Sequence, residues 1–159
     1  MNDSRFFSFA IMVASLWVGG LWIGGYLAVP VLFGAQPDRQ LAGMLAGEIF
    51  SRMALLDMLC ASYLLIFTWF GVREKISKRR LFVTLLTMLL FLLVIDFGLQ
   101  PAMGQLKQAA LPMDVMHSPL ASQFSLLHGV SSLLYLAESL LGLWLLWYLS
   151  TVTRGGQRI

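Results

Sequence analysis

The sequence contains little cysteine and few charged residues. Cys60 is the only cysteine among 159 residues, which excludes an intrachain disulfide and a cysteine metal cluster within one chain. Charged residues make up 12%, about half the share usual in a globular protein. Enzyme motifs such as HExxH, a Walker sequence or a nucleophile elbow are missing too, and the glycine pairs of residues 19–25 follow no predicted strand. We therefore expect neither a soluble domain nor an enzyme.

Long apolar stretches dominate what is present. Hydrophobic residues make up 58% of the chain and the mean hydropathy is +0.79. Four stretches, near residues 6–33, 51–72, 81–103 and 123–149, have the roughly 20 residues that a helix needs to cross the hydrocarbon layer. In lipid the backbone must satisfy its own hydrogen bonds, which favours helices. The sequence predicts an all-α integral membrane four-helix bundle, with one domain over residues 1–159.

A short basic loop sets the expected topology. Residues 73–80 read Arg-Glu-Lys-Ile-Ser-Lys-Arg-Arg and separate the second and third stretches. Loops rich in Lys and Arg stay on the cytoplasmic side of a membrane. With four spans, both termini are then expected to be cytoplasmic. The net charge of +3 follows from these topology signals, so we expect the lipid bilayer as a partner and no nucleic acid.

The segment between the first two spans has the pattern of an amphipathic helix. Leu41, Leu45 and Ile49 recur every four residues, which is the spacing of one helix face. It predicts either a short amphipathic helix at the outer interface or an extension of the second span. Glu48 and Arg52, four residues apart, are placed for an ion pair on such a helix.

Small residues form a stripe on the first span. Gly20, Gly24 and Ala28 repeat every four residues. This period lets two helix backbones approach closely in lipid, where packing drives association. Packing against another span of the same chain and formation of a homodimer are both open.

Ionisable residues inside the spans are the sharpest functional signal, because each is costly in a membrane and therefore points to function by default. Asp57, Asp96 and His128 all fall in the outer halves of their spans under the predicted topology. The polar residues that extend this cluster along the third and fourth spans are Gln100, Ser132, Tyr135 and Glu138. Two interpretations are open: a self-satisfied polar network, with Arg52 neutralising a carboxylate and His128 bonded to a serine or aspartate, or a site for a cation or small polar solute.

Metal and haem sites have little support. Asp96 and His128 are the candidate metal ligands, but the nine methionines form no tight ligand motif for copper. A haem b between helices needs two histidines at matching depth, and only His128 lies in a span, since His117 lies in a loop. We therefore expect no cofactor.

Three stretches resemble a known family: residues 17–33, which begin Trp-Val-Gly-Gly and end Val-Pro-Val-Leu-Phe, residues 42–50, and residues 124–133, which read Phe-Ser-Leu-Leu-His-Gly-Val-Ser-Ser-Leu. They resemble the bacterial family called domain of unknown function 4149, which is similar to eukaryotic transmembrane protein 205. The resemblance implies a four-span protein of the bacterial inner membrane without an established enzymatic activity, and hints at metal or drug handling. Tyr135 stands where the family leads us to expect an asparagine. The first span also looks like the copper-resistance D family, whose histidines are missing.

These observations lead to two functional hypotheses. The first is a permease-like or solute-binding protein that uses the outer polar cluster. The second is a non-catalytic accessory or assembly subunit that docks on a larger membrane complex through its apolar surface.

Overall fold

The computed structural model describes residues 3–72 and 74–155, so Arg73 of the basic loop lies outside the described residues. Within these ranges all regular elements are helices, which confirms the all-α prediction. They form four rods: α1 (Asp3–Ile23), η1 (Gly24–Ala28) and α2 (Val29–Ala35); α3 (Arg39–Gly71); α4 (Lys75–Leu93), η2 (Val94–Leu99) and α5 (Gln100–Ala110); and α6 (Ala121–Gly155), preceded by the short η3 (Val115–His117).

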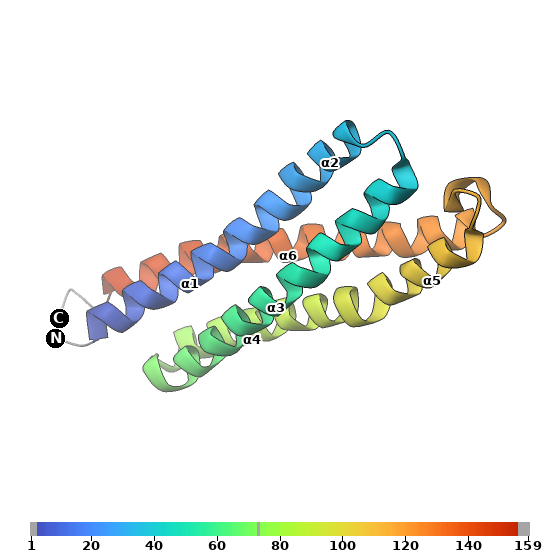
Figure 1. Cartoon of the computed structure of the whole chain (residues 1–159). Coiled ribbons are helices and arrows are strands. Elements are labelled where there is room, and N and C mark those ends of the chain that lie inside the picture. The colour runs from blue at the N-terminus through green and yellow to red at the C-terminus, as the bar shows by residue number, and fades with distance from the viewer. Residues whose placement is uncertain (1–2, 73, 156–159) are drawn as a thin grey trace.

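The rods run antiparallel to their neighbours along the chain (Figure 1). The turn between α3 and α4 lies at the same end of the bundle as the start of α1 and the end of α6. We call this the inner end, and the opposite end, with the other two connections, the outer end. The rods pack closely in the inner half and spread apart toward the outer end (Figure 1). The α3–α4 turn, the start of α1 and the end of α6 lie at one end of the bundle, which agrees with four spans. That this end is cytoplasmic stays a prediction.

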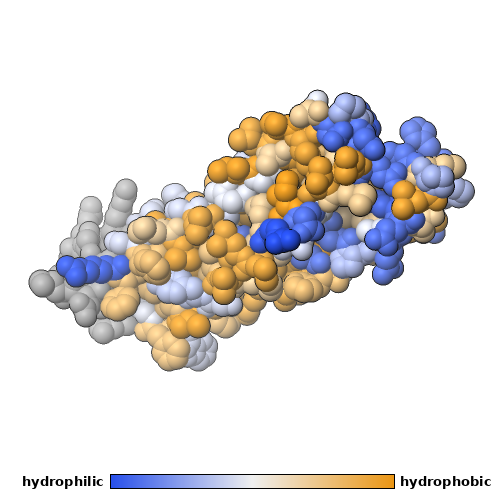
Figure 2. Space-filling model, in the orientation of Figure 1, coloured by the Kyte–Doolittle hydropathy of each residue, from blue (hydrophilic) through white to orange (hydrophobic). Residues whose placement is uncertain are grey.

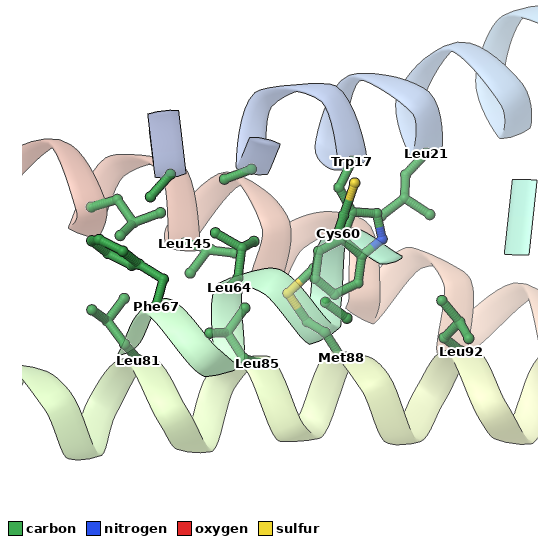
Figure 3. Packing of buried hydrophobic residues seen from close by; sticks show 14 of the residues in the cluster. Trp17, Leu21, Cys60, Leu64, Phe67, Leu81, Leu85, Met88, Leu92 and Leu145 are labelled. Carbon is green, nitrogen blue, oxygen red and sulfur yellow. The ribbon is translucent and has the colours of Figure 1, made fainter. Parts of the chain in front are cut away.

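The apolar core lies in the inner half. Trp17, Leu64, Leu85, Met88 and Leu145 come from all four rods and are buried between them (Figure 3). Large apolar side chains also cover the outside of the rods, and hydrophilic residues gather at the outer end (Figure 2). An apolar exterior is the expected surface of a bundle in lipid, where close packing between helices holds the rods together.

The exposed apolar side chains of α6 mark the depth of the bilayer. They run from Leu126 to Trp147, a stretch of about 30 Å at 1.5 Å per residue. This length matches the hydrocarbon core of a typical bilayer. Glu138 lies near the middle of this stretch and is therefore deep in the membrane.

Helix α3 is continuous from Arg39 to Gly71, so the separate short amphipathic helix is absent and the segment is an extension of the second span. The local sequence explains why. Pro37 comes just before the helix, and Asp38 Oδ1 accepts the backbone N–H groups of Gln40 at 2.9 Å and Leu41 at 3.1 Å. This is an N-cap. No proline follows within α3, so nothing ends the helix before Gly71.

Two rods contain a wider helical turn in their outer halves. In η1 the N–H of Val29 bonds to Gly24 O, and in η2 the N–H of Gln100 bonds to Ile95 O. Pro30 and Pro101 follow directly. Proline lacks an N–H and its ring clashes with the carbonyl four residues earlier, so the helix widens to a five-residue spacing. Such bulges are frequent at functional sites.

The inner end is held by local bonds around the α3–α4 turn. Glu74 caps α4 by accepting the N–H groups of Ile76 at 3.1 Å and Ser77 at 2.6 Å. Lys78 Nζ donates to Trp69 O at 2.5 Å and lies 4.8 Å from the Trp69 ring centroid. Hydrogen bonds from Ser77 hold the pKa of Glu74 below its usual value. These bonds close the inner end.

Candidate functional site

A cavity of about 900 Å³ lies between the spread outer halves of the four rods. This is within the range of pockets that bind small organic molecules. All seven residues of the predicted polar cluster line it, and they come from α3, η2, α5 and α6: Asp57, Asp96, Gln100, His128, Ser132, Tyr135 and Glu138. The structure therefore brings together side chains that are up to 81 positions apart in the sequence.

The deepest charged groups in this cavity are carboxylates without a counter-ion. Asp57 on α3 is 4% exposed and Glu138 on α6 is 2% exposed. One oxygen of each, Asp57 Oδ1 and Glu138 Oε1, has no hydrogen-bond partner among the described residues. Buried charges are normally paired because their desolvation is expensive. The cavity therefore contains two buried carboxyl groups whose hydrogen-bonding capacity the described side chains leave partly unsatisfied.

Three hydroxyl groups of the cavity wall, those of Tyr26, Ser132 and Tyr135, are by contrast bonded to protein. Tyr135 Oη donates to Leu21 O at 2.5 Å, and Tyr26 Oη donates to Ser139 Oγ at 3.2 Å. Ser132 Oγ donates to the carbonyl of His128, on its own helix, at 2.8 Å. These bonds fix part of the cavity wall, whereas the buried oxygens Asp57 Oδ1 and Glu138 Oε1 have no such bond among the described residues.

Aromatic rings make up much of the remaining wall. The ring centroids of Tyr26 and Tyr135 are 5.9 Å apart, and those of Phe50 and Tyr135 are 5.5 Å apart. Phe33 and Phe124 line the cavity as well. Such rings present electron-rich faces that attract cations. The aromatic wall and the carboxylates therefore favour the same kind of ligand, a cation.

The glycines of η1 allow α3 and α6 to approach the first rod. A Cβ on Gly24 would lie 2.6 Å from the Met53 sulfur, and a Cβ on Gly25 would lie 2.8 Å from Tyr135 Oη. A Cβ on Gly20 would be in ordinary contact with Met53, at 3.7 Å. Part of the predicted small-residue stripe thus packs inside the chain. A homodimer through Ala28 and its neighbours stays a prediction.

Glu48 and Arg52 lie outside the cavity. Arg52 Nη2 is 2.9 Å from Glu48 Oε1, and both side chains are largely exposed on the flank of α3. A pair of this kind contributes about 0.3–0.5 kcal/mol. Arg52 thus pairs with Glu48, the partner that their four-residue spacing predicts, and not with a carboxylate of the cavity.

His128 is exposed, and its ring stacks on Phe124 with centroids 5.9 Å apart. It faces the cavity together with Asp96. In the part of the chain that the structure describes, no three His, Cys, Asp or Glu side chains are grouped to hold a metal ion. The donor set proposed from the sequence, Asp96 and His128, therefore lacks a third ligand of these types.

Sequence reasoning missed Lys107, which lies on the cavity wall. Its Nζ donates to Gly43 O at 3.0 Å and lies 5.6 Å from the Phe124 ring centroid, so it links α5 to α3 and α6. A signal was available, because Asp96, Gln100 and Lys107 share one helix face at spacings of four and seven residues. Two further lining residues, Arg39 and Asp114, were also missed because they lie next to loops.

Four helices of 31 to 36 residues, long and apolar enough to cross a membrane, surround this cavity. The fold therefore defines a multi-pass membrane protein with a polar cavity inside an apolar exterior.

The chain belongs to the family described as domain of unknown function (DUF4149), whose model matches residues 12–111. This confirms the resemblance seen in the sequence. The matched region contains Asp57, Asp96 and Gln100 but ends before α6, so His128 and Glu138 lie outside it. Neither the curated proteins nor the solved structures gave a match.

Proposed function

We propose that this protein is a non-enzymatic membrane protein that binds a cation in the cavity between its outer helix halves. The observation that carries the proposal is the pair of buried carboxylates, Asp57 and Glu138, each with an oxygen that lacks a partner among the described residues. A bound cation supplies the charge and the ligand contacts that these groups lack. Asp96, from the widened turn η2, adds a third negative charge to the same cavity.

The position of the cavity supports access from outside the cell. Its lining residues belong to the halves of the rods that lie opposite the α3–α4 turn. Under the positive-inside rule the basic loop is cytoplasmic, and we place the protein in the bacterial inner membrane with both termini inside. The cavity then opens toward the outer face of that membrane.

The test is cation binding to the purified full-length protein in lipid nanodiscs. Calorimetric titration with K⁺, Mg²⁺, tetramethylammonium and tetraphenylphosphonium covers inorganic and organic cations. We expect at least one of them to bind the wild type, and the double substitution Asp57→Asn with Glu138→Gln to weaken that binding about 100-fold, since a buried charge contact contributes several kcal/mol.

The control is Glu48→Gln, which removes a carboxylate outside the cavity and is expected to leave the affinity unchanged. The proposal fails if none of the four cations binds, or if Asp57→Asn with Glu138→Gln binds them as the wild type does.

The alternative, an accessory subunit of a larger complex, stays a prediction. Mass measurement after solubilisation in mild detergent separates the two ideas. A single species containing only this chain supports independent action, whereas a stoichiometric second protein supports the accessory role.

A further inference from the structure

A second hollow lies beside the cavity, on the flank between α3 and α5. It is a groove of about 620 Å³. Six residues line both the groove and the cavity: Gln40, Gly43, Gly47, Asp96, Gln100 and Lys107. Because the same residues line the groove and the cavity, a single layer of residues separates the two hollows. We call this layer the α3–α5 seam.

The seam is thin because small residues form much of it. A Cβ added at Gly47 on α3, or at Gly104 on the α5 side of the groove, would meet no atom within 4 Å. The bond from Lys107 Nζ to Gly43 O, at 3.0 Å, crosses the seam. One flexible lysine side chain therefore holds together two helices that leave open space beside it.

The outer side of the groove faces lipid. Its lining includes the exposed apolar side chains Met44, Leu55, Phe97 and Leu111. The exposed Glu48–Arg52 ion pair also lines the groove, and its two charges balance each other. A molecule dissolved in the bilayer therefore meets these apolar side chains and the neutralised pair first, and the polar side chains of Gln100 and Asp96 next. That order suits a ligand with an apolar body and a positive charge.

The cavity fits the same kind of ligand. Its volume of about 900 Å³ far exceeds that of a bare ion, and no three metal-ligating side chains group together among the described residues. Aromatic rings of Tyr26, Phe50 and Tyr135 stand beside the unpartnered carboxylates Asp57 and Glu138. Aromatic faces attract organic cations, and carboxylates hold their charge.

We propose that the ligand is an amphiphilic organic cation that enters the cavity from the bilayer through the α3–α5 seam. Lys107 closes this entrance in the structure. The inference rests on the proposed cation site and adds the ligand class and its route.

The ligand class is tested with tetraphenylphosphonium, which is cationic and apolar, against tetramethylammonium, which is cationic and small. In nanodiscs we expect tetraphenylphosphonium to bind at least about tenfold more tightly, because only it fills the aromatic wall. Binding above that of empty nanodiscs must be lost in the variant carrying Asp57→Asn and Glu138→Gln. Equal or tighter binding of tetramethylammonium or K⁺ overturns this inference while the cation site stands. Absence of any carboxylate-dependent binding overturns both.

The route is tested by filling the seam. Gly47→Phe places a ring in open space at the seam, and we expect it to slow tetraphenylphosphonium association about tenfold, as measured by surface plasmon resonance on immobilised nanodiscs. Gly104→Phe fills the same groove from α5 and guards against a local folding defect of the first variant. Lys107→Met removes the bond to Gly43 and is expected to speed association a few-fold.

The matched control is Gly129→Phe on α6, where a Cβ also meets no atom within 4 Å and which lines neither hollow. It is expected to leave the association rate unchanged. If both seam-filling variants associate as fast as the wild type, the ligand enters elsewhere and the route is wrong.

Discussion

The inner and outer halves of this bundle are built in opposite ways. In the inner half, Trp17, Leu64 and Leu145 fill the space between regular α-helices, and Glu74 caps the start of α4. In the outer half, widened turns and glycines accompany helices that spread around a cavity with carboxylates on its wall. The difference indicates that packing in one half stabilises the bundle while the other half keeps groups that cost stability, which is what the proposed cation site requires.

Unpartnered polar atoms occur in both halves, but they differ in charge. Trp17 Nε1 in the core, like Trp22 Nε1, has no hydrogen-bond partner among the described residues. An indole N–H is a neutral donor, whereas Asp57 and Glu138 end in carboxyl groups that can ionise. The cost of leaving a polar group without a partner rises steeply with charge. The two halves therefore differ in the carboxyl groups that they bury, and not in whether they contain unpartnered polar atoms.

The largest expected effect is in the inner half. Leu145→Ala removes a fully buried side chain and leaves a void, which we expect to lower the free energy of unfolding by about 2–4 kcal/mol. Leu140→Ala, on the exposed side of the same helix, is the control and should change little. Unfolding in mixed detergent micelles provides the measurement. If the two substitutions had equal effects, packing in the inner half would not be what stabilises the bundle.

The next effect concerns close approach in the outer half. Gly25→Ala places a methyl group against the Tyr135 ring, so we expect it to destabilise the fold by about 1–3 kcal/mol. Gly34→Ala, at a position where a Cβ meets nothing within 4 Å, should be neutral or slightly stabilising. Both are measured by the same unfolding titration. A neutral Gly25→Ala would show that Tyr135 moves away easily.

Removal of a cavity charge should have the opposite sign. We expect Glu138→Gln to raise the stability of the ligand-free protein by about 1 kcal/mol, because the amide avoids the cost of keeping an ionisable carboxyl group buried without a counter-ion. Glu48→Gln outside the cavity should not stabilise. The thermal unfolding midpoint is measured for both. Destabilisation by Glu138→Gln would mean that this carboxylate supports the fold, and would contradict the division between the two halves.

The smallest effect is the acid sensitivity of the inner cap. The folded-state pKa of Glu74 is lowered by hydrogen bonds from Ser77 and Ile76, so its contribution is complete above the pKa of the unfolded state. It is lost as pH falls through the lowered folded value. We expect Glu74→Ala to lower the unfolding midpoint at neutral pH and to flatten its decline in acid. An unchanged pH profile would show that the cap contributes nothing.

Much of the fold follows from local sequence. Each rod is long and apolar on its own, so its helical form and its span did not depend on the other rods. The caps formed by Asp38 and Glu74 act within three residues of the helix starts. The extension of α3 was harder to predict, because amphipathic spacing alone does not show where one helix ends and another begins.

The sequence also predicted which polar residues of the spans gather at the cavity, except Lys107, but it did not predict how they are paired. Polar residues in apolar spans turn toward the inside of a bundle, which is why Asp57, Asp96 and His128 were found together. Their pairing was not predictable in this way. Lys107 reaches Gly43 on α3 instead of a carboxylate, and Asp57 and Glu138 each keep an oxygen without a hydrogen-bond partner among the described residues.

The sequence by itself determined four apolar helices, the shared end of the basic loop and the termini, and the residues that avoid lipid. These features depend on the length, hydropathy and charge of single segments. Only the tertiary structure decided that the outer halves spread around a cavity, that Asp57 and Glu138 each keep an oxygen without a partner among the described residues, and that Lys107 bonds across the α3–α5 seam. Those outcomes depend on the spacing and rotation of helices relative to one another, which no single segment specifies.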